Sequence, residues 1–241
     1  MKQMKIALIG YGKMGRAIEE IALQKGHEIL FRIDEDSTDL LTNSQLKTAD
    51  VAIEFTTPAT AFDNIMKCFD LGLPVVCGTT GWLDRLPEVE ARIVREEQTF
   101  LYASNFSIGV NLFFEINKRL AALMDKQPQY EVSLEEVHHT QKKDAPSGTA
   151  ITLAEQILRQ ISRKDKWVNE TTAQRAELEI VSKRIDPAPG THIVRYTSEI
   201  DDIEIRHTAH SRKGFAQGAL AAAAYVYDKK GLFTMKDVLG L

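Results

Sequence analysis

The chain has 241 residues, of which 44% are hydrophobic and 27% are charged, and its formal net charge is −4. This composition is typical of a globular protein and excludes a disordered, collagenous or coiled-coil chain. The mildly acidic balance also argues against a general nucleic-acid-binding protein, which carries a basic surface. At roughly 100–200 residues per domain, the length predicts one large domain or two small ones.

Cysteine usage and apolar runs bear on the compartment. The only two cysteines, Cys68 and Cys77, lack the spacing of a disulfide framework or of a C-x-x-C site. They fit a reducing compartment, so we expect a cytoplasmic protein. The apolar run Ile6–Ile9 is too short for a signal peptide, and no apolar stretch approaches the roughly 20 residues of a membrane span. Because metal-ligand spacing such as H-x-x-x-H is also absent, we expect no metal site.

The first 104 residues alternate between strand-like and helix-like segments. The strand-like segments are 6–9, 29–33, 51–55, 74–77 and 99–102, and the helix-like segments are 15–25, 58–69 and 83–97. Short apolar strands that alternate with helices form parallel β-α-β units. We therefore predict an α/β fold with a doubly wound parallel sheet in this part of the chain.

After Asn105 the rhythm changes. Residues 108–123 predict a long apolar helix, 130–137 a strand and 150–161 another helix, and the polar stretch 162–175 predicts a loop or exposed connection. Strand-like runs follow at 176–185, 190–198 and 203–210, before an alanine-rich helix at 215–227. Consecutive strands without long intervening helices predict a mostly antiparallel or mixed sheet, and hence a smaller α+β domain.

A glycine motif follows the first strand and opens the first helix. The motif reads Gly-Tyr-Gly-Lys-Met-Gly at 10–15, and Asp34 follows it by about 20 residues at the end of the second strand. In this Rossmann-type context the glycines allow a tight turn and close approach of a pyrophosphate to the helix N-terminus, and the acid holds a ribose hydroxyl. The motif predicts dinucleotide binding; a glycine turn needed only for packing is the alternative.

The residue after Asp34 bears on which dinucleotide is used. Sites for NADPH usually place Arg or Lys near the ribose 2′-phosphate, whereas this chain has Glu35. A second acid there would repel a phosphate, so the sequence favours NADH. Use of NADPH stays open because Arg32 and Lys13 could serve as counter-cations.

The densest set of reactive side chains lies between residues 135 and 150. It contains two histidines and two lysines within six residues, followed by a helix start with two hydroxyls: His138, His139, Lys142, Lys143, Ser147, Gly148 and Thr149. Ser147 is predicted as the helix N-cap. Free N–H groups at a helix start can hold a carboxylate, and lysine and histidine supply charge and protons. The segment predicts a site for a small anionic substrate that is protonated, although each part alone also fits a packing or capping role.

This segment resembles the signature of the 4-hydroxy-tetrahydrodipicolinate reductase family, also called dihydrodipicolinate reductases. Its pattern, His-His-x-x-Lys followed by Asp-Ala-Pro-Ser-Gly-Thr-Ala, is long and specific. The resemblance continues in Glu-Phe-Thr-Thr-Pro at 54–58, Gly-Thr-Thr-Gly at 78–81, Ala-Ser-Asn-Phe-Ser-Ile-Gly-Val-Asn at 103–111, Ser-Arg at 211–212 and Phe-Ala at 215–216. It spans nearly the whole chain.

The resemblance implies NAD(P)H-dependent reduction of a cyclic imine dicarboxylate to tetrahydrodipicolinate in lysine (diaminopimelate) biosynthesis. It also implies a dinucleotide-binding domain over 1–104 and a substrate-binding and tetramerisation domain with a mixed sheet over 105–211. The C-terminal segment 212–241 would return to the first domain. The whole chain would bind the small dicarboxylate and would assemble with three further copies of itself into a homotetramer.

Residue roles follow from the same resemblance. His138 and Lys142 would be catalytic, and the substrate carboxylates would be held by His139, Ser147, Gly148, Thr149 and Thr80. The cofactor would contact Gly10, Tyr11, Gly12, Lys13, Met14, Gly15, Asp34, Gly78, Thr79, Thr80, Ala103, Ser104, Asn105 and Phe106.

Two other classes of protein remain as alternatives. One is another two-domain dehydrogenase of amino-acid metabolism, of the aspartate-semialdehyde or diaminopimelate dehydrogenase kind; the former needs a nucleophilic cysteine. The other is a non-catalytic regulator that senses NAD(H), which would leave His138 and Lys142 without a role. Demonstrated turnover separates the enzymes from the regulator.

Overall fold

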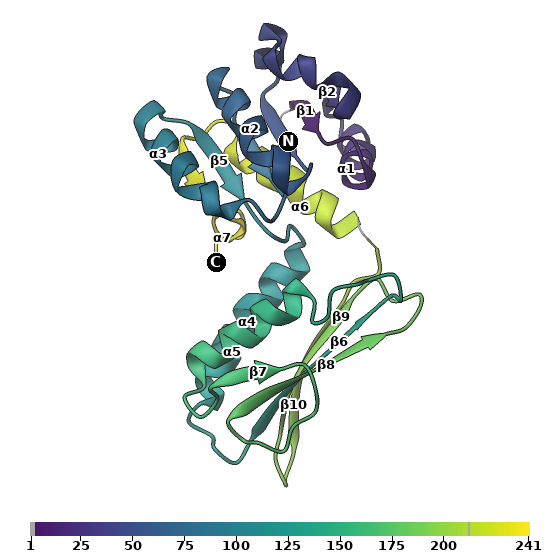
Figure 1. Cartoon of the computed structure of the whole chain (residues 1–241), viewed down its shortest axis with the longest axis vertical. Coiled ribbons are helices and arrows are strands. Elements are labelled where there is room, and N and C mark those ends of the chain that lie inside the picture. The colour runs from purple at the N-terminus through teal and green to yellow at the C-terminus, as the bar shows by residue number, and fades with distance from the viewer. Residues whose placement is uncertain (1–2, 212) are drawn as a thin grey trace. The chain divides into compact units, whose positions relative to one another are not determined.

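The computed structural model describes residues 3–211 and 213–241. The chain divides into two compact units: unit 1 comprises Met1–Ile108 and Lys213–Leu241, and unit 2 comprises Gly109–Arg212 (Figure 1). Arg212, at which the sequence places the start of the returning C-terminal segment, lies outside the described residues, as do Met1 and Lys2.

Unit 1 contains a six-stranded parallel sheet with the strand order β11-β5-β4-β3-β1-β2. Its strands are β1 (Lys5–Ile9), β2 (Glu28–Ile33), β3 (Val51–Glu54), β4 (Val75–Cys77), β5 (Thr99–Tyr102) and β11 (Gly231–Phe233). Its helices are α1 (Lys13–Gln24), α2 (Pro58–Asp70), α3 (Leu86–Glu96), α6 (Lys213–Val226) and α7 (Met235–Leu239). Short 3-10 turns occupy Glu35–Thr42, Ser44–Thr48 and Leu83–Arg85. The predicted doubly wound sheet is confirmed.

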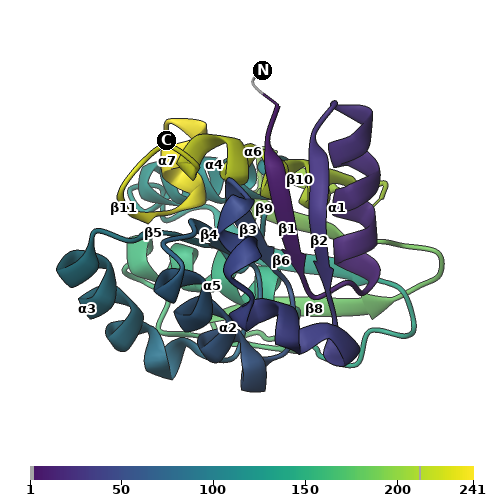
Figure 2. The same cartoon turned by 90° about the horizontal axis from the view of Figure 1, so that it is seen from above.

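Helices cover both faces of this sheet, which explains its uninterrupted apolar strands. Because side chains alternate along a strand, Ile6 and Leu8 pack toward α1 and α6, while Ala7 and Ile9 pack toward α2 and α3. Figure 2 shows α1 beside the strands and α2 and α3 together on one side. Loops follow the carboxyl ends of β1, β2, β3 and β4.

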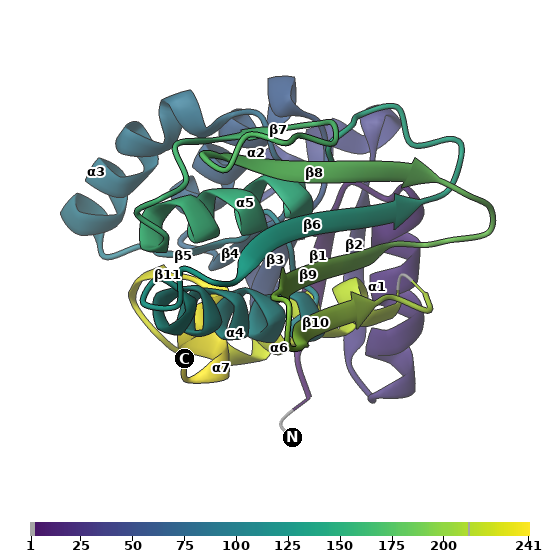
Figure 3. The same cartoon turned by 90° about the horizontal axis from the view of Figure 1, so that it is seen from below.

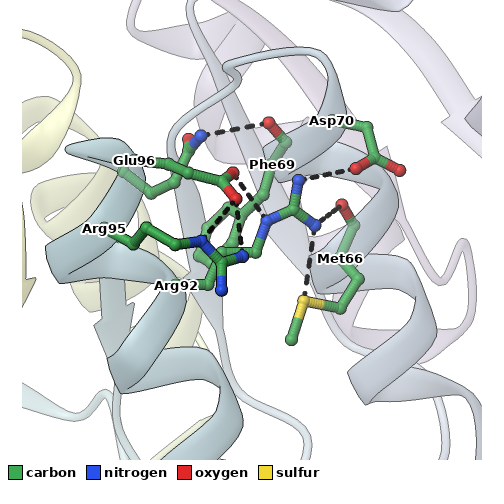
Figure 4. A network of polar contacts seen from close by, with 7 residues as sticks. Met66, Phe69, Asp70, Arg92, Arg95 and Glu96 are labelled. Atoms are coloured by element: carbon green, nitrogen blue, oxygen red, sulfur yellow. Dashed lines mark hydrogen bonds and ion pairs between the residues drawn. The ribbon is translucent and has the colours of Figure 1, made fainter.

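The two helices α2 and α3 are joined by one arginine (Figure 4). The guanidinium of Arg92 on α3 donates hydrogen bonds to the carbonyl oxygen of Met66 at 3.1 Å and to the carboxylate of Asp70 at 2.6 Å, both on α2. It also bonds Glu96 one turn along α3, at 2.8 Å. These contacts fix the register of the two helices beneath the sheet.

Unit 2 contains a mixed five-stranded sheet with the order β10-β9-β6-β8-β7. Its strands are β6 (Glu131–His138), β7 (Lys166–Val168), β8 (Glu177–Arg184), β9 (Thr191–Thr197) and β10 (Asp202–Thr208), and its helices are α4 (Ile108–Met124) and α5 (Gly148–Gln160). β6 pairs in parallel with β8 and antiparallel with β9, so the predicted mixed sheet is confirmed. The prediction of a loop or exposed connection over 162–175 is wrong at Lys166–Val168, because these residues form β7, which pairs with β8; three residues are too few to show an alternating pattern.

The strand β6 carries the site residues on its covered face. Val132 and Leu134 pack with α4 and α5, and the same alternation continues through Glu136 to His138 at the carboxyl end of the strand. Figure 3 shows β6 between β8 and β9. The covered face of β6 is therefore apolar at its start and carries the buried polar pair Glu136 and His138 at its end.

The helices begin at recognisable start signals. Pro58 occupies the first turn of α2, and Ser147 caps α5 as predicted.

In the described part of the chain, the helices lack the combination of length and apolar character that a membrane span requires.

Candidate active site

The predicted glycine motif forms the turn between β1 and α1. Gly10 has φ +95°, and a Cβ there would lie 2.0 Å from the carbonyl oxygen of Phe55. A Cβ on Gly15 would lie 2.4 Å from the carbonyl oxygen of Gly10. At Gly12, by contrast, an added Cβ would meet no protein atom within 4 Å. Protein packing therefore requires glycine at 10 and 15 but not at 12, whose open surface fits the approach of a pyrophosphate.

Two pockets at this loop bring together most of the predicted cofactor residues. One, of about 460 Å³, is lined by Gly10, Tyr11, Gly12, Asp34 and residues that follow β3. The other, of about 400 Å³, is lined by Gly12, Lys13, Met14, Gly78, Thr79 and Thr80. The two pockets share Gly12, Phe55 and Thr56, and both open at the carboxyl ends of the parallel strands. That edge is where open α/β sheets bind dinucleotides.

The larger pocket is acidic. Asp34, Glu35 and Asp36 line it, and no Lys or Arg is among its described lining residues. The Asp34 carboxylate accepts hydrogen bonds through Oδ1 from the Asp36 backbone and the Ser37 hydroxyl, at 3.2 and 2.8 Å. The nearby guanidinium of Arg32 is held by the carboxylate of Glu19, through Nε at 2.7 Å. The charge around Asp34 is therefore strongly negative.

A buried carboxylate holds the loops that follow β3 and β4. Glu54 is fully buried and accepts hydrogen bonds from the backbone N–H of Thr56 at 3.1 Å and from the thiol of Cys77 at 3.1 Å. The same Thr56 N–H also donates to the hydroxyl of Thr79 at 2.8 Å. Burial, and then the charge of Glu54, raises the pKa of the Cys77 thiol well above its ordinary value. Cys77 is thus a buried thiol and lacks the thiolate character of a nucleophile.

In unit 2, three strands assemble a buried polar cluster around His138. The imidazole Nδ1 of His138 contacts one carboxylate oxygen of Glu136, and Arg184 on β8 donates to the other oxygen at 2.9 Å. The register of β6 explains this: Arg184 lies beside His138, and His192 on β9 lies beside Glu136. The His192 ring packs edge-on against His138, with 5.1 Å between ring centroids.

The charge states within this cluster follow from burial and from its partners. Burial opposes ionisation of Glu136, but its contact with His138 and its hydrogen bond with Arg184 outweigh burial and hold the pKa of this carboxyl well below its ordinary value. Burial is the main cause that lowers the pKa of His192 to about 3. His192 is therefore neutral near pH 7, and its Nε2 lies 3.1 Å from the hydroxyl of Ser147.

Glu136, His138 and His192 also form a group of the kind that can bind a metal ion, with one ligand atom from each lying within 4.8 Å of the others. Protein partners already occupy parts of this group. Arg184 takes one oxygen of Glu136, and Ser147 contacts one nitrogen of His192. Because a guanidinium already balances the only carboxylate, we interpret the cluster as an ion-pair network.

The loop after β6 carries Lys142. Its ammonium group pairs with the carboxylate of Asp144 at 2.9 Å and is half-buried. Arg184 donates to the carbonyl oxygens of Lys142 and Asp144 at 3.2 and 2.6 Å, so one side chain anchors both the loop and Glu136. A second anchor is Thr140, whose hydroxyl donates to Asp186 at 2.6 Å.

The N-terminus of α5 follows this loop. The Ser147 hydroxyl accepts a hydrogen bond from the Ala150 N–H at 3.2 Å, which confirms the predicted N-cap. Gly148 is exposed, and an added Cβ there would meet no protein atom within 4 Å. Thr149 is half-buried in the same turn. These residues leave open space in front of backbone N–H groups, which suits a carboxylate.

Comparison with known proteins gives the family. Residues 4–106 match the family described as "Dihydrodipicolinate reductase, N-terminus", and residues 109–239 match "Dihydrodipicolinate reductase, C-terminus". The chain belongs to the dihydrodipicolinate reductase family. A 4-hydroxy-tetrahydrodipicolinate reductase of Christiangramia forsetii is 52% identical over 238 residues, which cover 98% of each chain. Another, of Alkaliphilus oremlandii, is 33% identical over 95% of each chain.

A solved structure of the family is also similar. The dipicolinate-bound dihydrodipicolinate reductase of Paenisporosarcina sp. TG-14 superposes with a TM-score of 0.79 at 25% identity, over 97% of this chain and 98% of that one. An amine dehydrogenase of Mycobacterium smegmatis shares the fold at 9% identity, with a TM-score of 0.60. The family fold therefore extends over both units.

The remaining candidate residues of this family member are spread more widely. Thr80 lies in unit 1, whereas His139, Ser147 and Thr149 lie in unit 2. The segment Ala103–Phe106 follows β5 and is absent from the described lining of both pockets. Phe106 itself is buried, with its ring 5.5 Å from that of Phe55.

Three residues of the cluster were not predicted to have a role: Glu136, Arg184 and His192. Glu136 carried a usable signal, because it stands two residues before His138 and hence on the same face of the strand. Arg184 and His192 carried no such signal, since only strand pairing brings them to β6.

Proposed function

We propose that this member of the dihydrodipicolinate reductase family reduces 4-hydroxy-tetrahydrodipicolinate, by way of the cyclic imine dicarboxylate, to tetrahydrodipicolinate in lysine biosynthesis, with NAD(P)H as reductant. The observation that carries the proposal is 52% identity over 98% of a 4-hydroxy-tetrahydrodipicolinate reductase. The unbroken segment from His138 to Thr149, with its proton donors and its helix start, supports it.

Unit 1 binds the cofactor in this proposal, and the pockets at Gly12 support that role because they offer backbone N–H groups, Lys13 and a ribose-binding acid. The reduced nicotinamide supplies a hydride to the conjugated imine when bound. The residues of unit 1 must hold the rest of the cofactor and balance the charge of its pyrophosphate. Gly78, Thr79 and Thr80 extend the same binding surface.

Unit 2 binds the dicarboxylate and supplies the proton. Hydride addition places negative charge along the ring, and His138 or Lys142 delivers the proton that quenches it. The carboxylates are held by Ser147, Gly148 and Thr149 at the start of α5, and by His139. The half-buried ammonium group of Lys142 offsets the charge of a dianion.

Turnover by the purified protein tests the proposal. We expect substrate-dependent oxidation of reduced nicotinamide when the substrate is generated enzymatically in the assay. Lys142→Ala should lower kcat by about 100-fold or more, the usual contribution of a positioned proton donor, and leave cofactor binding nearly unchanged. Lys143→Ala, one residue along the exposed loop, is the matched control. No turnover by the wild type would refute the function, and an unchanged rate would remove Lys142 from it.

The acidic pocket supports a preference for NADH. The 2′-phosphate of NADPH would lie near Asp34, Glu35 and Asp36, and Arg32 is already paired with Glu19. Coulomb repulsion there penalises the extra phosphate charge. This proposal concerns the choice between the two cofactors and is independent of the identity of the dicarboxylate.

We expect a higher kcat/KM with NADH than with NADPH, and Glu35→Arg should raise kcat/KM for NADPH by about tenfold, which is roughly 1.4 kcal/mol. Glu90→Arg on the exposed surface of α3 makes the same charge change outside both pockets and should leave the ratio unchanged. A wild-type preference for NADPH would contradict the argument.

A further inference from the structure

The two ring nitrogens of His138 have different surroundings. Nδ1 contacts the carboxylate of Glu136, whose other oxygen is held by Arg184. Nε2 faces the backbone of Gly190, where an added Cβ would lie only 3.0 Å away. The missing side chain at Gly190 therefore leaves room beside Nε2, while Nδ1 is turned toward a buried acid.

We propose that Glu136, fixed by Arg184, is a positioning residue that holds neutral His138 as its Nδ1–H tautomer and leaves Nε2 to exchange protons with the dicarboxylate. This inference rests on the proposed proton-transfer role of His138. A carboxylate that accepts a hydrogen bond from Nδ1–H fixes both the tautomer and the orientation of an imidazole. The same carboxylate stabilises the imidazolium that forms when Nε2 takes up a proton.

Several charged or titratable groups face this imidazole. On its own strand there is Glu136, and the loop after β6 contributes Lys142, paired with Asp144. β8 contributes Arg184. From β9 the ring of His192 packs against His138. His207 on β10 lies behind His192 and acts on its charge. The carboxylate of Glu136 is the anion in direct contact with the ring, so its removal has the largest effect on the imidazolium.

The substitution Glu136→Gln tests the contact with little change in shape. Arg184 can donate only to the amide oxygen, which turns the amide NH₂ toward His138 Nδ1. Nδ1 must then accept, and the proton of the neutral ring moves to Nε2. Glu135→Gln is the matched control, because it removes the same charge one residue away, where the carboxylate pairs with Lys183 at 2.7 Å on the other face of the strand.

The first readout is the ¹⁵N NMR spectrum of histidine-labelled protein, with the His138 signals identified by their loss in His138→Gln. We expect the Nδ1–H tautomer in the wild type and in Glu135→Gln, and the Nε2–H tautomer in Glu136→Gln. An Nε2–H tautomer in the wild type would overturn the inference, and this measurement needs no variant of Glu136 to fold.

The second readout is kcat. Without the carboxylate, Nε2 carries the ring proton and cannot accept another, and the imidazolium that proton transfer forms loses its neighbouring anion. At pH 7.5 kcat should fall about tenfold or more while KM for the cofactor is unchanged. Glu136→Asp, which keeps the charge, should recover part of the rate. An unchanged tautomer in Glu136→Gln, whatever its rate, would contradict the inference.

The two readouts separate this inference from the proposed function. If the tautomer changes in Glu136→Gln but kcat does not, Glu136 positions His138 and the proton-transfer role of His138 fails. If the wild type shows no turnover at all, the proposed function fails while the tautomer still tests the contact with Glu136.

Discussion

At the scale of single residues, His192 shows how burial sets a charge in the site. Its pKa in the folded protein is about 3, well below the ordinary value of 6.5. As pH falls below 6.5, His192 therefore takes up a proton in the unfolded chain but stays neutral in the folded chain. Stability is lost progressively down to about pH 3, at up to about 1.4 kcal/mol per pH unit.

This linkage gives a prediction for His192→Gln, which keeps a polar group toward Ser147 but does not titrate. Between pH 7 and pH 5 the free energy of unfolding should fall less steeply in the variant than in the wild type, by about 2 kcal/mol. Urea unfolding at several pH values measures the slope. Burial also lowers the pKa of His27 and His207, and both histidines remain in the wild type and in the variant. Parallel slopes would show that His192 does not titrate as described.

Sequence reasoning at this scale succeeded where chemistry is local in the chain. The N-cap at Ser147 and the glycine turn at 10–15 depend on neighbours within a few residues, and both are seen in the structure. The roles of Glu136, Arg184 and His192 depend on the register between three strands, with β6 paired to residues 46 positions along the chain in β8 and 54 to 66 positions along in β9. No single-strand pattern contains that register.

At the scale of elements, two glycines in α6 have opposite roles. A Cβ on Gly218 would lie 1.8 Å from the carbonyl oxygen of Phe106, so the helix can approach the segment after β5 only with glycine there. A Cβ on Gly214 would lie 3.8 Å from the Ser107 hydroxyl, which is an ordinary contact. Packing, rather than helix propensity, explains Gly218.

We therefore expect Gly218→Ala to lower the free energy of unfolding by about 2 kcal/mol or more, because backbone must move to admit the methyl group. Gly214→Ala should raise it by about 0.4–1 kcal/mol, since alanine restricts the unfolded chain and fits the helix. Thermal or urea unfolding of the two variants measures the difference. Equal effects would mean that α6 does not approach Phe106 as closely as the structure has it.

The helices and long strands were predictable because their apolar periodicity extends over several turns or alternations. β7 and β11 were not, because each has three residues and lacks the fully buried apolar run that marks the equally short β4. They are defined by their partner strands: β7 pairs with β8, and β11 with β5. The 3-10 turns of Glu35–Thr42 and Ser44–Thr48 were missed for a related reason, since their short repeats carry no long apolar pattern.

At the scale of the whole molecule, the sheet of unit 2 has one face toward α4 and α5 and one face without them. The second face carries Val137, Val181 and Ile193 among ion pairs such as Arg195 with Glu204 at 2.5 Å. Protein–protein contacts have an apolar core and a polar rim, and these apolar side chains beside charges that already pair with each other fit that arrangement. We propose that copies of the chain associate through this face as a homotetramer.

Light scattering coupled to size-exclusion chromatography measures the assembly. We expect about four times the chain mass of 27.1 kDa for the wild type. Val181→Arg should yield smaller species, because it buries an unpaired charge in the proposed contact. Glu155→Arg, at an exposed position of α5, is the control and should not change the mass. A monomeric wild type would contradict the proposal.

Because β11 and α6 come from the last residues of the chain, unit 1 is built from two separated stretches. During synthesis on a ribosome, the face of the sheet that α6 covers, including Ile6, Leu8 and Val76, exists as an uncovered apolar surface until residue 226 has emerged. Unit 2 is continuous and is complete earlier. The nascent chain then has a complete unit 2 while the sheet of unit 1 still lacks α6 and β11, so we expect chaperones that bind apolar segments to act on its N-terminal part.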